Sequence, residues 1–168
     1  DEGYTAYVSG LDLAAILPEL ADNDIHPPLH YLALHVWQLV AGPSEFSLRF
    51  LSAALGVLAI PLLLKLGALL FNRSVALVGG LVLTVAPLHV LYSQEARMYA
   101  MAAFAVSLSF YGLVKLLNGE KRYLPIYILG IVLSLYSDYL PYLALISQFL
   151  YLIIFKRKFF KIVFLGML

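Results

Sequence analysis

Residues 48–71 read LRFLSAALGVLAIPLLLKLGALLF, an apolar run whose only charged residues are Arg49 and Lys65. A helix needs about 20 apolar residues to cross the hydrocarbon core of a bilayer, and this run is long enough. Lys65 lies near the end of the run, so its ammonium group can reach the membrane surface. The run therefore predicts a membrane-spanning helix, around which the other segments are placed.

Four further apolar runs follow, separated by short polar turns: residues 75–92, 98–117, 123–136 and 139–155. The chain is 62% hydrophobic and 12% charged, whereas soluble domains are about 45–50% apolar and about 25% charged. Pro87 is expected to bend the run in which it lies. We predict an all-α fold, a polytopic membrane helix bundle over residues 48–168 with about five complete spans. A sixth run begins near the end, and we interpret the chain as a fragment of a longer protein.

The charges separate to opposite ends of these spans if the first span starts outside the cell. The outer set comprises Asp1, Glu2, Asp12, Glu19, Asp22, Asp24, Glu45, Glu95 and Asp138, with His26, His30, His35, His89, Arg49 and Arg97. The inner set comprises Lys65, Arg73, Lys115, Lys121, Arg122, Lys156, Arg157, Lys158 and Lys161, with Glu120. The inner bases follow the positive-inside rule. The outer carboxylates and histidines suggest a reaction centre on the extracytoplasmic side of an integral membrane protein.

Residues 29–40 are apolar but too short for a span, and they end at Gly42-Pro43. If they crossed the membrane, every later loop would change sides and the bases at 156–158 would face outward. We therefore expect this segment to be re-entrant or to lie along the outer surface. Residues 4–20 show helical periodicity with a polar side, which is typical of an interfacial helix. Residues 1–47 are thus predicted to form an outer loop with juxtamembrane helices.

Composition also limits the partners and sites that can be expected. The chain has no cysteine, which excludes disulfides and thiolate metal sites. Its formal net charge is only +1, and nothing in the sequence indicates a nucleic-acid partner.

Two groups of outer residues can carry chemistry. Asp1 and Glu2 are adjacent carboxylates, suited to general-base work or to a divalent cation, although such a pair is often only a solvated end. Asp24, His26, His30 and His35 offer oxygen and imidazole ligands, but their spacing matches no recognised metal motif. The alternative is that His26 caps the turn, while His30 and His35 lie at the membrane interface with their polar tips hydrated.

Arg49 and Arg97 are the only fixed cations in the outer set. A guanidinium group can bind a phosphate through two parallel hydrogen bonds. Each arginine also has a simpler alternative, namely an ion pair with Glu45 for Arg49, at helical spacing, and with Glu95 for Arg97. The residues alone leave both alternatives open.

Four blocks of sequence carry a resemblance to a known family. They are DEGY (1–4), HPPLHY (26–31), SEFSLRFLSA (44–53) and YSQEARMY (92–99). In order and spacing they resemble glycosyltransferase family 39 and the aminoarabinose-transferase-like membrane enzymes of the GT-C fold. The resemblance covers residues 1 to about 117. It implies a partial GT-C fold in which 29–40 is juxtamembrane, in agreement with the charge argument.

The resemblance also implies an activity. Such enzymes transfer a sugar from a polyprenyl-phosphate donor to a hydroxyl or phosphate of an acceptor on the outer side, with inversion at the anomeric carbon. The expected partners are the donor, an acceptor protein, lipid or glycan, and membrane lipids.

Residue roles follow from the same resemblance. Asp1 is expected to be the catalytic base or to orient the acceptor, with Glu2 as its partner and Glu95 as a second acid. His26, Arg97 and Arg49 are expected to face the donor phosphate. Asp24, His30 and Asp138 are the candidates for a divalent metal cation. Many relatives carry His-Tyr where this chain has Asp138-Tyr139, so a histidine ligand there is missing.

Two other functions compete with the transferase. A transporter would place polar groups near the middle of the membrane on broken helices, whereas these spans carry few ionisable groups at that depth. A non-catalytic lipid-binding membrane subunit is opposed mainly by the Asp1-Glu2 pair.

Overall fold

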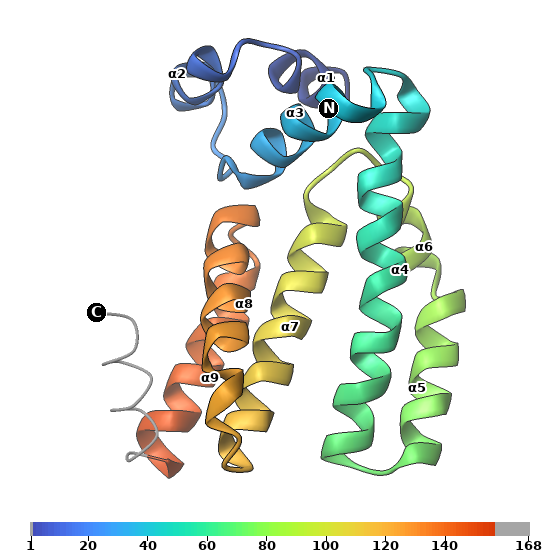
Figure 1. The fold of residues 1–168 in the computed structure, drawn as a ribbon, viewed down its shortest axis with the longest axis vertical. Coiled ribbons are helices and arrows are strands. Elements are labelled where there is room, and N and C mark those ends of the chain that lie inside the picture. The colour runs from blue at the N-terminus through green and yellow to red at the C-terminus, as the bar shows by residue number, and fades with distance from the viewer. Residues whose placement is uncertain (1, 157–168) are drawn as a thin grey trace.

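The computed structural model describes residues 2–156, and every regular element in this part of the chain is a helix (Figure 1). The helices are α1 Glu2–Ser9, α2 Leu13–Asn23, α3 Leu29–Ala41, α4 Glu45–Leu70, α5 Arg73–Val85, α6 Pro87–Ser93, α7 Tyr99–Leu117, the 3-10 turn η1 Lys121–Tyr123, α8 Leu124–Ser137 and α9 Pro141–Phe155. The first three helices lie across one end of a bundle that α4 to α9 form (Figure 1). The predicted all-α helix bundle is confirmed, and its division at residues 47 and 48 stays a prediction.

The long helix α4 and the following helix α5 each begin at a side chain that caps the helix N-terminus. The Ser44 side-chain oxygen accepts a hydrogen bond from the Ser47 amide at 3.2 Å, as is typical of a helix N-cap. The Asn72 side chain caps α5 in the same way through the Val75 amide at 2.9 Å. With 26 residues, α4 is about 39 Å long, which exceeds the hydrocarbon thickness of about 30 Å.

Pro87 divides the second predicted span into two helices. The segments α5 and α6 meet at Ala86 with a bend of 59°. Proline has no amide hydrogen to continue the helix, and the Val90 amide restarts the pattern by donating to the Ala86 carbonyl. The expected bend is thus confirmed, and its size indicates either a broken span or a re-entrant segment.

Fewer helices in residues 2–156 reach the length of a span than the five spans predicted, and the number of spans stays a prediction. By length and hydropathy α4 and α7 can cross a membrane, and α5 with α6 can do so if the bent pair is one span. The helices α8 and α9 have 14 and 15 residues, about 21–23 Å, so they fall short of the hydrocarbon thickness. They are shorter than the apolar runs because η1 and the turn at Asp138 use the flanking residues. The predicted sixth run lies outside the described residues.

The N-terminal segment also differs from its prediction. Periodicity predicted one interfacial helix over residues 4–20, whereas the structure contains α1 and α2 with a turn between them. The Gly10 amide donates to the Ala6 and Tyr7 carbonyls, which closes α1, and Asp12 in extended conformation precedes α2. Apolar residues continue across this turn because both helices bury one face, so the hydrophobic pattern did not reveal the break.

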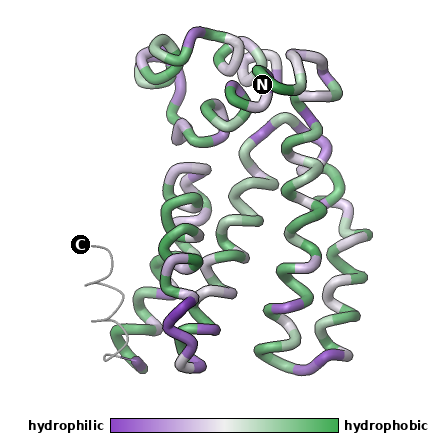
Figure 2. The backbone as a smooth tube through the Cα atoms, viewed as in Figure 1, coloured by the Kyte–Doolittle hydropathy of each residue, from purple (hydrophilic) through white to green (hydrophobic). Residues whose placement is uncertain are grey.

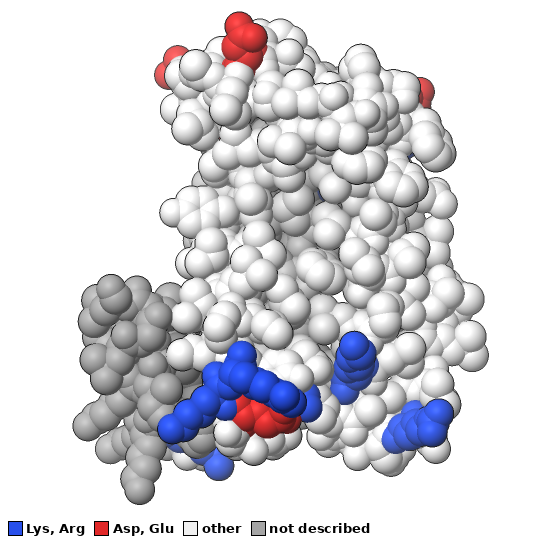
Figure 3. Space-filling view, viewed as in Figure 1, with Lys and Arg blue, Asp and Glu red and all other residues white. Residues whose placement is uncertain are grey.

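Charge and hydropathy follow the axis of the bundle. The helical rods are mostly apolar, and the polar stretches lie in the outer layer and at the turns of the opposite end (Figure 2). On the face shown in Figure 3, Lys and Arg gather at the end opposite α1–α3, and acids lie on the layer itself. Glu120 is the acid among the bases, where it forms ion pairs with Lys115 at 2.7 Å and Arg122 at 2.9 Å. The predicted separation of charge is therefore present within the described residues.

Two glycines bring α7 and α8 into close contact. A β-carbon built at Gly112 would lie 2.7 Å from the Tyr127 backbone, and one at Gly130 would lie 2.5 Å from the Ser109 amide nitrogen. Small residues at such positions let membrane helices approach closely enough for backbone packing. Gln148 on α9 donates to the Ser109 hydroxyl at 2.8 Å and joins the third helix to this pair.

Replacing Gly130 with alanine is expected to destabilise the bundle. The added methyl group would collide with backbone atoms, which cannot move as a side chain can, so we expect a loss of about 1–3 kcal/mol. Thermal unfolding of the complete protein in detergent measures this loss. Gly79→Ala is the matched control, because a β-carbon there meets nothing within 4 Å. Equal midpoints for the two variants would contradict the packing argument.

Candidate functional site

The carboxylate of Glu2 connects α1 to α4 and to the α6–α7 loop. Glu2 Oε2 lies 2.7 Å from Arg49 Nη2, and Glu2 Oε1 accepts hydrogen bonds from Arg49 Nε at 3.2 Å and from the Ala96 amide at 2.6 Å. The hydrogen bond from Arg49 lowers the pKa of Glu2 despite its partial burial, and the Ala96 amide adds to this effect. Glu2 thus has a clear positioning role. Its predicted neighbour in catalysis, Asp1, lies outside the described residues.

The two outer arginines have different surroundings. Arg49 is paired with Glu2 and also with Glu45 at 3.0 Å, so the alternative expected at helical spacing is present. Arg97 forms no ion pair with any described residue, and the alternative pair with Glu95 is absent. Its guanidinium carbon lies 5.6 Å from the centre of the Tyr99 ring, a cation–π distance. Within residues 2–156, Arg97 is therefore the outer arginine that remains available for an anion.

Glu95 is half-buried beside this arginine. It lies near enough to Arg49 for their charges to interact, but it forms no ion pair within the described chain. The role of Glu95 as a second acid therefore stays a prediction.

The carboxylate of Asp24 accepts its hydrogen bonds from residues close to it in the chain. Its Oδ1 lies 2.7 Å from His26 Nδ1 and accepts hydrogen bonds from the Ile25 and His26 amides at 2.7 and 3.2 Å, and its Oδ2 accepts from the Tyr31 hydroxyl at 2.5 Å. Burial opposes the charged form, but the Tyr31 and His26 bonds outweigh it and lower the pKa of Asp24. Burial and the Asp24 bond raise the pKa of Tyr31 well above its usual value. Tyr31 was not predicted, because an aromatic residue beside a membrane resembles an ordinary interfacial tyrosine.

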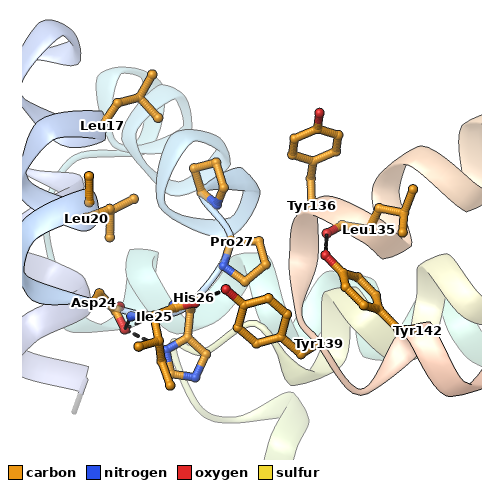
Figure 4. Close-up of a pocket in the computed structure, with 12 residues that line it drawn as sticks. Leu17, Leu20, Asp24, Ile25, His26, Pro27, Leu135, Tyr136, Tyr139 and Tyr142 are labelled. Carbon is orange, nitrogen blue, oxygen red and sulfur yellow. Dashed lines mark hydrogen bonds and ion pairs between the residues drawn. The ribbon is translucent and has the colours of Figure 1, made fainter.

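A pocket of about 540 Å³ lies between the α1–α3 layer and the end of α8, and we call it the α2 pocket. Its lining includes Leu17, Leu20, Asp24, His26, Tyr136 and Tyr139. Figure 4 shows Leu17, Leu20 and the segment from Asp24 to Pro27 on one side, with the tyrosines facing them. The Tyr139 hydroxyl donates to the Ile25 carbonyl, so the turn after α8 is bonded directly to the outer layer (Figure 4).

An apolar groove of about 360 Å³ opens on the other side of the same turn, and we call it the α7–α9 groove. Its lining includes Tyr92, Tyr99, Ala102, Val106, Asp138 and Pro141. Asp138 is only 6% exposed and accepts a hydrogen bond from the Tyr139 amide at 2.6 Å. The Arg97–Tyr99 contact places a cation next to one end of this groove.

His30 is buried in the layer, with 1% of its surface exposed. Neither ring nitrogen has a hydrogen-bond partner of normal geometry within the described chain, although the Ala96 backbone lies beside the ring. Burial, with the nearby charge of Arg97 as a smaller cause, lowers the pKa of His30 to about 4. The imidazole is therefore neutral at physiological pH.

The described structure does not bring the predicted metal ligands Asp24, His30 and Asp138 together in one group. No group of three or more His, Asp or Glu side chains in residues 2–156 is arranged to hold one. Asp24 is occupied by four hydrogen bonds, and the His30 nitrogens are enclosed. Asp138 lines the α7–α9 groove, whereas Asp24 lines the α2 pocket, and the metal site stays a prediction.

Stability is expected to depend on pH through His30. Its folded pKa of about 4 lies below the ordinary 6.5, so folding excludes the proton. The contribution of neutral His30 to the free energy of unfolding is complete above about pH 6.5. It is lost as the pH falls toward 4, and the full loss is about 3 kcal/mol. In thermal unfolding of the complete protein at pH 7 and pH 4.5, His30→Asn should lose less stability on acidification than the wild type. His89→Asn, a half-buried histidine on α6, should keep the wild-type dependence; parallel changes in all three proteins would refute the assignment.

Comparison with known proteins places this geometry in a family. No curated protein and no solved structure matches the chain. The model of the family described as dolichyl-phosphate-mannose-protein mannosyltransferase matches residues 25–168. This range contains His26, Arg49 and Arg97, and the helices from α3 onward that line the two cavities. The match supports a membrane glycosyltransferase that uses a polyprenyl-phosphate sugar donor. The chain belongs to the dolichyl-phosphate-mannose-protein mannosyltransferase family.

Proposed function

We propose that the protein transfers a sugar from a polyprenyl-phosphate donor to an acceptor at the end of the bundle covered by α1–α3, on the extracytoplasmic side and with inversion. The observation that carries this proposal is the α7–α9 groove with Arg97 beside it. An apolar groove next to a guanidinium group without a carboxylate partner suits a ligand that is a lipid at one end and a phosphate at the other.

The groove provides the apolar half of the donor site. Ala102, Val106 and Pro141 line it with small or apolar side chains, and Tyr92 and Tyr99 lie toward its outer end. An isoprenoid chain gains free energy on entering such a surface in proportion to the apolar area that both lose from water. Tyrosine suits the boundary, because its ring is apolar and its hydroxyl remains hydrated.

Arg97 provides the charge that the reaction needs. A glycosyl phosphate leaves as a phosphate anion, so a fixed cation beside a low-dielectric groove stabilises the developing charge. Glu2 holds the Ala96 amide at 2.6 Å, and thereby positions the backbone next to Arg97. Arg49 is the weaker candidate for this role, since two carboxylates already neutralise it.

Inversion follows if one displacement exchanges the phosphate for the acceptor oxygen. The bond from the anomeric carbon to the phosphate oxygen breaks as the acceptor oxygen attacks from the opposite side, and a base removes the hydroxyl proton. Asp1 is proposed for this base on the strength of the resemblance. A positioned base contributes roughly 10²–10⁴-fold to such a step.

The orientation rests on the charged ends of the bundle. The bases lie near the C-terminal end of α4, at the start of α5, and from the last turn of α7 into η1, which is the end of the bundle away from α1–α3 (Figure 1). Since Lys and Arg are retained on the cytoplasmic side, α1–α3 would face outward.

Arg97→Gln is expected to raise the KM for the donor by about 10–100-fold, because a charge-assisted bond to phosphate is worth about 1.5–3 kcal/mol. The assay follows sugar transfer by the complete protein in membranes with a panel of polyprenyl-phosphate sugars. Arg122→Gln, at the opposite end of the bundle, should leave the donor KM unchanged.

The same assay tests the base and the reaction class. Asp1→Asn should abolish transfer while leaving the protein inserted in the membrane. Absence of transfer by the wild type with every donor would point instead to a transporter or a lipid-binding subunit.

A further inference from the structure

The α7–α9 groove contains a charged side chain to which the donor site proposed above gives no role. Asp138 is the only buried acid among residues 2–156, with 6% of its surface exposed, and it lines the groove. Its carboxylate accepts one hydrogen bond from within the described chain, from the Tyr139 amide at 2.6 Å. An ionised carboxylate has about four lone-pair sites for hydrogen bonds. Most of the acceptor capacity of Asp138 is therefore left for a ligand.

Asp24 is a useful contrast, because its carboxylate is satisfied within the chain. It accepts hydrogen bonds from the Ile25 and His26 amides, from the His26 ring and from the Tyr31 hydroxyl. Asp138 has neither a cationic partner nor a side-chain donor among the described residues. A charge removed from water without partners is costly, so a ligand that enters the groove has to supply hydrogen-bond donors.

Asp138 lies at the outer end of the groove. Helix α7 runs from Tyr99, at the end nearest the α1–α3 layer, to Val106, which is about 10 Å deeper (Figure 1). Asp138 directly precedes Tyr139, whose hydroxyl is bonded to that layer. The carboxylate is thus at the same end as Arg97 and away from the part of the groove that suits a lipid.

The order of groups in the donor then decides which of them meets Asp138. A polyprenyl-phosphate sugar is linear, in the order lipid, phosphate, sugar. With the lipid in the deep part of the groove and the phosphate beside Arg97, the sugar lies at the outer end. Arg97 and Asp138 form no ion pair with each other in the described chain, so each is available to a different part of one donor. A carboxylate repels a phosphate anion but accepts hydrogen bonds from hydroxyls, so the sugar is the part that suits Asp138.

Two aromatic rings complete this end of the groove. Tyr92 and Tyr99 line it, with their ring centres 4.6 Å apart and an angle of 50° between the ring planes. A sugar ring has an apolar C–H face and polar hydroxyls at its edge. Such a ring fits a site that combines aromatic surface with a small number of polar groups.

We propose that Asp138 is a specificity-determining residue, which accepts a hydrogen bond from a non-reacting hydroxyl of the donor sugar. The proposal rests on the proposed transferase function and deepens it by giving the sugar a place in the groove. The bonded hydroxyl keeps its hydrogen throughout, because the bond that breaks joins the anomeric carbon to the phosphate oxygen. Removal of the acceptor proton is left to the base, and Asp138 has no part in it.

Binding to the complete protein in lipid nanodiscs tests this proposal without depending on turnover. The ligands are the polyprenyl-phosphate sugar that supports transfer in the assay above, its monodeoxy analogues, and polyprenyl phosphate without a sugar. Asp138→Asn keeps the shape of the side chain and an oxygen for the Tyr139 amide. It should raise the Kd for the donor about tenfold, the low end of what a bond to a charged group contributes. The Kd for polyprenyl phosphate should stay the same or fall, since the lost charge does not attract a phosphate.

The monodeoxy analogues identify the contact itself. One of them should bind the wild type about tenfold more weakly than the donor does, because it lacks the hydroxyl that Asp138 accepts from. Asp138→Asn should bind this analogue and the donor equally well. Asp12→Asn is the matched control, because Asp12 is an exposed acid before α2 whose side chain makes no capping bond. It should keep the wild-type Kd for every ligand.

Three results would overturn the proposal. They are an unchanged donor Kd in Asp138→Asn, an equal rise in Kd for the donor and for polyprenyl phosphate, and deoxy analogues that lose the same factor in the variant as in the wild type. These results differ from failure of the proposed function, in which the wild type transfers no sugar from any donor.

Discussion

The arrangement of the outer end depends on the carboxylate of Glu2. It binds a side chain on α4 and a backbone amide in the α6–α7 loop, and the latter contact joins residues 94 positions apart. Bonds of this kind between charged groups are shorter and stronger than neutral ones. The layer that forms one wall of the α2 pocket and the loop that carries Arg97 thus share one anchor.

The second constraint is the turn between α8 and α9. Its tyrosine is bonded to the Ile25 carbonyl, and its aspartate faces the apolar groove. Adjacent residues of this turn therefore line different cavities, Tyr139 the α2 pocket and Asp138 the α7–α9 groove. Because the lining of each cavity comes from several helices, neither exists without the packing of α7, α8 and α9 through Gly112, Gly130 and Gln148.

Features that depend on neighbouring residues were predictable from the sequence, and features that depend on distant ones were not. The length of α4, the bend at Pro87 and the Arg49–Glu45 pair follow from local spacing. The Glu2 contacts could not be predicted, since they require the folded position of α4. Asp24 and His26 were identified as residues that can do chemistry, but their pairing with each other became apparent only in the structure. Asp1, the predicted catalytic base, lies outside the described residues.

The separation of charge along the bundle has an electrical consequence. With acids at one end and bases at the other, the molecule has a dipole along the membrane normal. A resting potential of 100 mV, negative inside, acts on each charge moved across the membrane with about 2.3 kcal/mol. The potential therefore favours the orientation with α1–α3 outside for as long as the membrane is energised. Inversion of the folded bundle would have to work against this field as well as against the burial of its polar ends.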